Sequence, residues 1–112
     1  MNIENSQAQM KKGILELCIL TIAAHTDVYA SDILREMKER KLIIVEGTLY
    51  PLLTRLKNEG LLSYRWEESQ SGPPRKYYVI TETGKLYQKS MLSAWKNMKK
   101  SVDEITQNIH SL

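Results

Sequence analysis

Hydrophobic residues recur at helical spacing in three successive stretches near the start of the chain. The pattern predicts helices over about Gln7–Ala24, Ala30–Lys41 and Glu46–Glu59. Ser6 and Gln9 fit a capping box at the start of the first helix. That helix is apolar on more than one side, which is typical of a helix packed between neighbours. We therefore expect the chain to begin with a bundle of three helices.

The third predicted helix combines one apolar stripe with one polar face. Leu49, Leu52, Leu53 and Leu56 follow the spacing i, i+3, i+4 and i+7, and Gly60 is placed to end the helix. At about 100° per residue the opposite side has no acidic residue. It consists of Gly47, Tyr50, Pro51, Thr54 and Asn58, flanked by Thr48, Arg55 and Lys57. This surface suits a polyanionic partner, although a solvated helix face would show the same pattern.

Beyond the third helix the pattern changes to short stretches rich in β-formers. Leu61–Trp66 and Lys76–Ile80 predict the two strands of a hairpin, joined by a long loop over Glu67–Arg75. Alternation along the second strand would turn Tyr78 and Ile80 to the same face. Because a lone hairpin is marginally stable, we expect that face to pack on the helices.

The predicted loop of the hairpin combines stiffness with positive charge. Gly72, Pro73 and Pro74 leave it little conformational freedom to lose on binding. Arg75 and Lys76 follow directly, and cations that contact phosphates release counterions. The loop is therefore a candidate contact with a nucleic-acid backbone, with a solvated hairpin end as the alternative.

The last stretch predicts one long helix that begins at Thr81–Glu82 and runs towards Asn108. Its hydrophobic residues alternate spacings of four and three, the repeat of a helix that packs along another helix. They are Tyr87, Met91, Trp95, Met98, Val102, Ile105, Ile109 and Leu112.

Composition describes an ordinary soluble domain. The 112 residues are 42% apolar and 26% charged, and the net charge of +3 with a pI near 9.0 permits a polyanionic partner without requiring one. Cys18 is the only cysteine, which excludes an internal disulfide and a multi-cysteine metal site. No stretch has the length of a membrane span or the order of a secretory signal, so a cytoplasmic location is expected.

The sequence contains no recognisable set of catalytic or metal-binding residues. The two histidines lie in a predicted loop and at the tail, and no carboxylate pair, phosphate loop or nucleophile–base set stands out. We therefore expect no catalytic residue, no metal and no cofactor.

Three helices followed by a hairpin is the order of a winged helix-turn-helix, in which the third helix enters the major groove. The expected fold is mainly α (α+β), with residues 1–80 as the DNA-binding part and 81–112 as a long C-terminal helix of one compact domain.

The sequence also resembles the PadR-like transcriptional regulators over nearly its whole length. The resemblance rests on Gly47-Thr48-Leu49-Tyr50-Pro51-Leu52-Leu53, Leu56, Glu59-Gly60-Leu61-Leu62, Gly72-Pro73-Pro74-Arg75-Lys76-Tyr77-Tyr78, Thr81 and Gly84. It implies a repressor that binds a pseudo-palindromic operator as a homodimer held by the last helix and the first. Val45 departs from the expectation of a capping Ser, Asn or Asp before the recognition helix.

The polar face of the third helix, the hairpin loop and the hydrophobic seam of the last helix, together with the resemblance, give the candidate sites. The DNA-binding candidates are Thr48, Tyr50, Thr54, Arg55, Lys57, Asn58, Arg75 and Lys76, and the dimer candidates are Leu17, Met91, Trp95, Met98, Val102, Ile105 and Ile109. Family members that bind drugs have a tryptophan near the place of Trp95, so Met91, Trp95 and Met98 are candidates for a planar aromatic ligand.

Two alternatives stay open at this point. Trp95 can pack in a dimer core without any ligand, as large aromatic residues at such seams usually do. The whole chain can also be a winged-helix adaptor that contacts proteins and never DNA. Such an adaptor has no need for Arg75 and Lys76 beside a rigid loop, and duplex DNA would fail to bind it.

Overall fold

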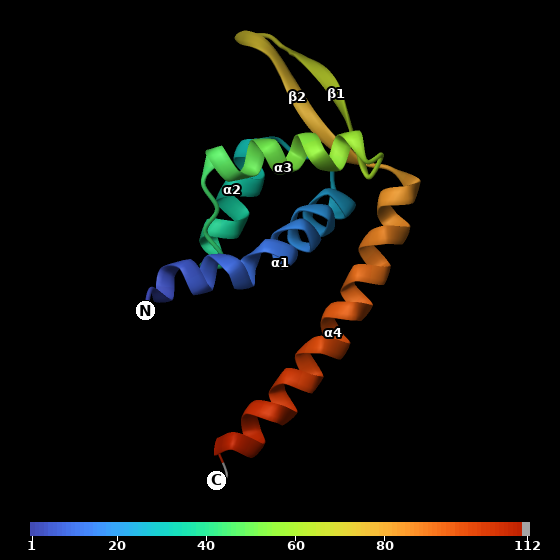
Figure 1. The fold of residues 1–112 in the computed structure, drawn as a ribbon. Helices are drawn as coiled ribbons and strands as arrows, with labels where there is room; N and C mark the ends of the chain where they lie inside the picture. Colours follow the sequence, from blue (N-terminus) through green and yellow to red (C-terminus); the bar gives the residue numbers. More distant parts are fainter. Residues whose placement is uncertain (111–112) are drawn as a thin grey trace.

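The computed structural model describes the backbone of residues 1–110 and the side chains of residues 1–107. Figure 1 shows a helical layer, a hairpin above it and a last helix that leaves both. The elements in chain order are α1 (Ile3–His25), α2 (Ala30–Glu39), α3 (Glu46–Asn58), β1 (Leu62–Ser69), β2 (Gly72–Ile80) and α4 (Glu82–His110). The predicted winged-helix fold with a long C-terminal helix is confirmed.

Helix α1 begins four residues earlier than predicted. The side chain of Asn2 caps it by accepting a hydrogen bond from the Asn5 backbone N–H at 3.1 Å. Ser6 lies inside the first turn, where its hydroxyl donates to the Asn2 carbonyl at 3.3 Å, so the predicted capping box was wrong. Asparagine is as good a cap as serine, and nothing in the intervening residues prevents a helix.

The third helix follows the prediction closely. It begins after Val45, which provides no side-chain cap, and ends before Glu59 and the left-handed Gly60 at φ 78°. Helix α2, in contrast, stops at Glu39, before Lys41, whose φ of 62° is incompatible with a helix. The predicted end at Lys41 was therefore two residues too late.

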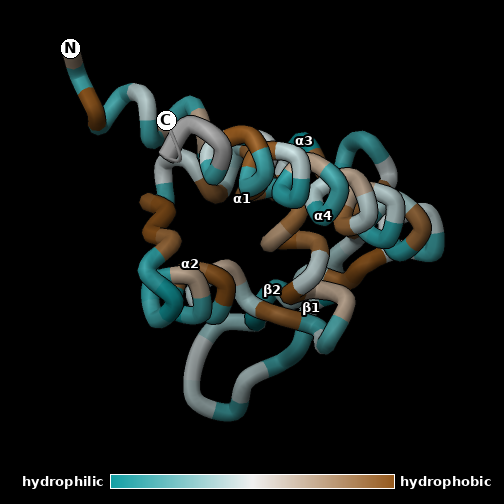
Figure 2. The backbone as a smooth tube through the Cα atoms, turned by 90° about the horizontal axis from the view of Figure 1, so that it is seen from below, coloured by the Kyte–Doolittle hydropathy of each residue, from teal (hydrophilic) through white to brown (hydrophobic). Residues whose placement is uncertain are grey.

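One hydrophobic core joins the helices and the inner end of the hairpin. Figure 2 views the chain from below, with α1 and α4 on one side and α2 and the hairpin on the other. The side chains that are fully buried between these elements are Ile19, Leu20, Ile33, Leu49, Leu53, Leu56 and Leu62. Three of these seven come from the leucine stripe of α3, which therefore anchors this helix to the core.

The hairpin strands extend into the segment predicted as a loop. Leu62 pairs with Ile80 at the core end, and Ser69 pairs with Gly72 at the tip, with a register shift between Glu67 and Ser69. The long loop over Glu67–Arg75 was thus wrong, because a two-stranded ribbon has open edges that tolerate prolines. Tyr78 and Ile80 are buried on one face, as predicted.

Helix α4 is tied to the base of the hairpin. The Thr81 hydroxyl donates to the Gly60 carbonyl at 2.6 Å and accepts from the Gly84 N–H at 2.9 Å, which confirms the predicted cap. Farther along, the Gln88 side-chain amide donates to the Thr21 hydroxyl on α1 at 3.0 Å. Among the described helices, none has the length and apolar character needed to cross a membrane.

Candidate nucleic-acid interface

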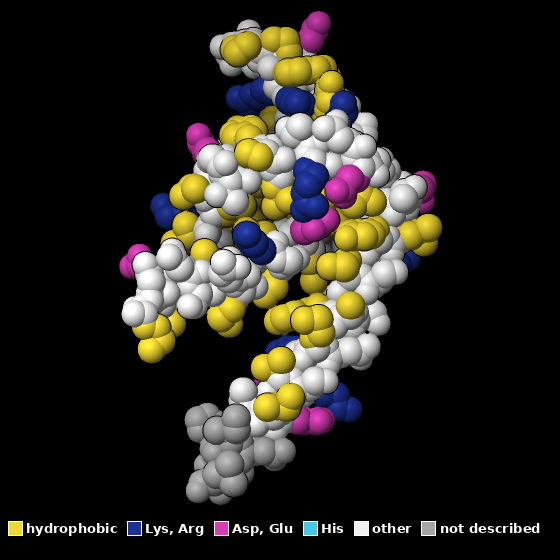
Figure 3. Space-filling model, in the orientation of Figure 1, with side chains coloured by type: hydrophobic (Ala, Val, Ile, Leu, Met, Phe, Trp, Pro, Cys, Tyr) yellow, Lys and Arg dark blue, Asp and Glu magenta, His cyan; other side chains and the backbone are white. Residues whose placement is uncertain are grey.

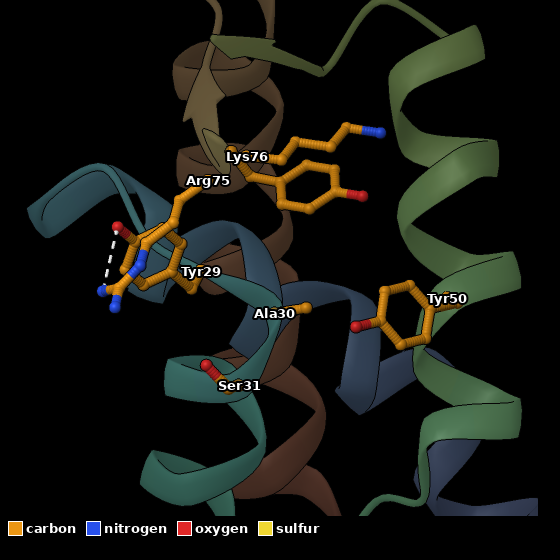
Figure 4. A pocket seen from close by; sticks show the side chains of 7 residues that line it. Tyr29, Ala30, Ser31, Tyr50, Arg75 and Lys76 are labelled. Carbon is orange, nitrogen blue, oxygen red and sulfur yellow. Dashed lines mark hydrogen bonds between the residues drawn. The ribbon is translucent and has the colours of Figure 1, made fainter. Parts of the chain in front are cut away.

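A groove lies at the base of the wing, where α2, α3 and β2 meet. Figure 4 shows Tyr29 and Ser31 at the start of α2, Tyr50 on α3, and Arg75 and Lys76 on β2 around it. Its volume is about 450 Å³, and Ala30 and Tyr78 complete the lining. We call it the wing-base groove. It brings together three of the DNA-binding candidates predicted from the sequence, Tyr50, Arg75 and Lys76.

Arg75 is held in this groove by an aromatic residue. Its guanidinium donates to the Tyr29 hydroxyl at 3.5 Å and lies 5.3 Å from the centre of the Tyr29 ring. The hydrogen bond to Tyr29 raises the pKa of Arg75 from its ordinary value. The ring orients the cation without cancelling its charge.

Lys76 is surrounded by rings of the wing. Its ammonium lies 4.1 Å from the centre of the Tyr64 ring, 5.3 Å from Tyr78 and 5.9 Å from Trp66. Lys57 of α3 reaches the same Tyr64 ring at 5.6 Å. In the part of the chain that the structure describes, neither lysine forms an ion pair with a carboxylate. Two cations from two elements are therefore available to an anion near Tyr64.

The start of α2 adds backbone donors to the same groove. Ala30 and Ser31 are the first two helical residues, so the geometry of a helix leaves their N–H groups without an intrahelical acceptor. The Asp32 carboxylate accepts from the Tyr29 N–H at 3.1 Å and so closes the turn before them. The positive end of the helix dipole points to the groove, as in many phosphate sites.

Arg65 of the wing, in contrast, is neutralised by carboxylates. Arg65 donates to Asp27 at 2.9 Å and to Glu67 at 3.4 Å, and its guanidinium lies 4.4 Å from the centre of the Tyr77 ring. Tyr77 stacks on Tyr29 with ring centres 4.0 Å apart. Hydrogen bonding to Tyr29 raises the pKa of Tyr77 to about 12, so this phenol stays neutral at ordinary pH. These contacts hold the wing on the segment before α2.

The predicted residues of α3 divide into two groups. Thr48, Tyr50, Thr54, Lys57 and Asn58 are exposed. Arg55 lies about 140° around the helix from Tyr50 and forms ion pairs with Glu16 at 3.1 Å and Glu59 at 3.4 Å. The hydrogen bond to Glu16 raises the pKa of Arg55. Arg55 is therefore exposed on the flank of α3, where two carboxylates neutralise it.

Sequence reasoning missed the aromatic supports of the cations. Tyr29, Tyr64 and Trp66 were not candidates, although they contact Arg75 and Lys76. The strand register would have found two of them, because Trp66 pairs with Lys76 and Tyr64 with Tyr78 on one face of the ribbon. Tyr29 had no such signal, since it meets Arg75 only through the tertiary fold.

A second groove of about 690 Å³ separates the outer part of α1 from α4. Figure 3 shows hydrophobic side chains along the side of α4 that faces α1. The groove is lined by Met10, Gly13, Ile14, Leu17, Met91, Ala94, Trp95, Met98, Lys99, Val102 and Asp103. We call it the α1–α4 groove. It contains the three predicted ligand residues Met91, Trp95 and Met98, together with the dimer candidates Leu17 and Val102.

The chain buries only part of this hydrophobic seam by itself. Met98, Val102 and Ile105 are more than half exposed, whereas Leu17 is buried. The side chain of Ile109 and the seam residue Leu112 fall outside the described residues. Within the described residues, no cluster of three His, Cys, Asp or Glu side chains has the geometry of a metal site.

Comparison with known proteins agrees with the motifs. The chain matches the profile of the transcriptional regulator PadR-like family over residues 19–90. It is similar to the structure of a PadR-like transcription factor from Bacteroides fragilis, with 51% identity, a TM-score of 0.75, and coverage of 90% of this chain and 98% of that one. A PadR-like regulator from Bacillus cereus is 35% identical with a TM-score of 0.79, covering 88% and 97%. An uncharacterized protein from Lysinibacillus sphaericus is 30% identical over 95 residues, 82% of this chain and 87% of that protein.

Proposed function

Because the chain belongs to the PadR-like family of transcriptional regulators, we propose that it represses transcription by binding a pseudo-palindromic operator as a homodimer. Family membership makes it a DNA-binding regulator and not an enzyme. The repressor role, the homodimer and the ligand described below are the proposal.

The wing-base groove is the observation that supports this proposal best. It places two cations, the first turn of α2 and Tyr50 around one concave surface. A phosphate beside Arg75 would receive its charge and hydrogen bonds from the start of α2, whereas Lys76 points from the other face of β2 toward α3, where a second phosphate would meet it. With these phosphates fixed, the exposed face of α3 lies against the adjacent major groove.

Two groups of residues then divide the work. Arg75, Lys76 and Lys57 contact phosphates, which provides affinity that falls as salt rises. Thr48, Tyr50, Thr54 and Asn58 contact base edges, which provides preference for one sequence. Arg55 is left out of both groups, because its charge is matched by Glu16 and Glu59.

The unburied seam of α4 supports the homodimer. Met98, Val102 and Ile105 repeat at coiled-coil spacing and are exposed in the single chain. A second copy of the chain, packed along α4 and α1, would cover them together with the half-buried Met91 and Trp95. Two recognition helices in successive major grooves must then lie about 34 Å apart, one turn of DNA.

The α1–α4 groove supports control by a small planar aromatic compound. Trp95 offers a flat ring, and Met91 and Met98 offer pliable side chains on either side of it. A compound bound there would change how the two copies pack and so the separation of their recognition helices. Binding should quench the fluorescence of Trp95 but not that of Trp66, and a Trp95→Phe variant distinguishes the two.

The test of DNA binding is a titration of labelled duplexes followed by fluorescence anisotropy. Duplexes enriched by the protein from a random pool are compared with scrambled duplexes at two salt concentrations. Selective, salt-sensitive binding with two protein chains per duplex is the expected result. Equal weak binding to all duplexes contradicts an operator, and no binding even at low salt favours an adaptor that contacts only proteins.

A further inference from the structure

We propose that the ion pair between Glu16 and Arg55 sets the position of the recognition helix against α1 and α4, and thereby the half-site spacing that the dimer accepts. Arg55 is then a positioning residue and not a phosphate contact. The inference rests on the proposed dimeric binding of DNA, and one of the two readouts below does not need DNA.

The pair connects elements that are far apart in the sequence. Glu16 lies on α1 and is only 8% exposed, and its Oε2 accepts from Nη2 of Arg55 at 3.1 Å. The other guanidinium nitrogen of Arg55 donates to Glu59 at 3.4 Å. Glu16 also lies close enough to Tyr87 of α4 that its negative charge raises the pKa of that phenol. One buried carboxylate therefore stands where α1, α3 and α4 meet.

An ion pair of this kind fixes the relative position of two helices more than it increases the free energy of unfolding. Desolvation of a buried carboxylate offsets most of its attraction to the partner, so an ion pair of this kind adds little to the free energy of folding. Separation of the two groups, however, leaves the Glu16 carboxylate without its cation; Arg55 is 51% exposed and can be hydrated, so the cost falls on Glu16. Any slide or rotation of α3 along α1 separates Glu16 from Arg55 and has this cost. A hydrophobic contact between the same helices would permit such a shift more easily.

The neighbouring residues link this contact to the rest of the molecule. Leu17, next to Glu16, lines the α1–α4 groove, and Thr21 accepts the hydrogen bond from Gln88 of α4 one turn later. The same stretch of α1 thus contacts α4 and, through Glu16, the recognition helix. An altered packing of α1 against α4 is therefore transmitted to α3 by Arg55.

The first readout is the preference for half-site spacing. Duplexes enriched by the native protein are shortened or lengthened by one base pair between the half-sites, and binding is measured for the native protein, Glu16→Gln, Arg55→Gln and the double variant. We expect each single variant to lose the preference for the native spacing by about fivefold or more. The double variant should lose no more than either single variant, because all three break one contact.

The matched control is Glu59→Gln, which removes the other carboxylate near Arg55 but leaves α1 and α3 connected. Its spacing preference should stay native. If Glu16→Gln fails to fold, Glu16→Asp keeps the charge and withdraws the carboxylate from Arg55, and it should show the same loss of spacing preference.

The second readout is hydrogen exchange of the α3 amides without DNA. Exchange over residues 49–58 should be faster in Glu16→Gln and Arg55→Gln than in Glu59→Gln, because only the first two release α3 from α1. If the native protein enriches no duplex, the proposed function fails and the spacing claim falls with it, while faster exchange would still establish the positioning contact.

Two results would overturn the inference. If Arg55→Gln lowers the salt slope of DNA binding by about one and Glu16→Gln does not, Arg55 contacts a phosphate. If neither variant changes the spacing preference or the exchange of α3, the pair does not position the helix.

Discussion

Two regions of this protein hold their cations in different ways. In the wing-base groove, Arg75 and Lys76 lie against the rings of Tyr29 and Tyr64. At the junction of α1, α3 and α4, Arg55 lies between two carboxylates. All three cations are on or beside the elements of the winged helix, so their position in the sequence does not distinguish them.

The two kinds of partner differ in whether they leave the positive charge of the cation available to another anion. An aromatic ring restricts the rotamers of a cation but keeps its charge, so the cation can still attract a phosphate. A carboxylate orients the cation and also cancels its charge. Ring-supported cations are therefore suited to bind an external anion, and carboxylate-paired cations are suited to hold the fold. Arg65, bound to Asp27 and Glu67, belongs to the second class although it lies on the wing.

The largest effect is expected at Gly84, where the first turn of α4 lies against the base of the wing. A Cβ at this position would overlap the Leu61 carbonyl oxygen and press on Ile80, and both belong to the base of the wing. Gly84→Ala should therefore reduce the free energy of unfolding by about 2–3 kcal/mol or more, measured by chemical denaturation. Gly47→Ala is the control, because its Cβ would meet nothing within 4 Å, and it should leave stability unchanged or slightly higher. Equal effects at both positions would show that the wing base and α4 are not rigidly joined.

The next effect separates the two classes of cation on the wing itself. Lys76→Gln should lower the slope of log K against log salt by about one, because one phosphate contact is lost. Arg65→Gln removes the same charge from the same strand pair but should leave the slope unchanged, because Arg65 is already neutralised. Anisotropy titrations at several salt concentrations measure both. A lower slope for Arg65→Gln would break the distinction between ring-supported and carboxylate-paired cations.

The smallest effect concerns the rings alone. Tyr64→Leu keeps every charge but removes the ring nearest to Lys76 and Lys57, so affinity should fall by about 0.5–1 kcal/mol with the salt slope unchanged. Trp66→Leu should cost less, since Lys76 lies 5.9 Å from that ring. The measurement is affinity for one enriched duplex at fixed salt. A larger loss for Trp66→Leu would mean that Trp66 contacts the DNA itself.

Local rules were sufficient where one segment decides its own structure. The four leucines of α3 predicted its buried face, Gly60 predicted its end, and Thr81 predicted the cap of α4. The structure agrees with each of these predictions. The helical period also identified the exposed face with Tyr50 and Thr54. These features depend on residues within a turn or two of one another, so spacing alone is informative.

Local sequence rules did not predict features that depend on a choice between two caps or on contacts between residues far apart in the sequence. Two acceptable caps stood four residues apart, and the sequence did not show that Asn2 would be preferred to Ser6. The partner that neutralises Arg55 lies 39 residues earlier, so the helix period placed this arginine on a flank without revealing Glu16. Likewise, Tyr29 and Arg75 meet only after α2 and β2 have packed together.

The prolines of β2 also affect how separate molecules behave in solution. Tyr78 directs both its N–H and its C=O away from β1, to Val28, at 2.7 and 3.1 Å. Because strand residues alternate, Lys76 and Pro74 face the same outer edge. Pro74 has no N–H, and Lys76 places a charge beside it, so the free edge near the tip is a poor template for another strand. A concentrated solution of this protein should therefore resist the edge-to-edge assembly of wings that leads to β-rich aggregates.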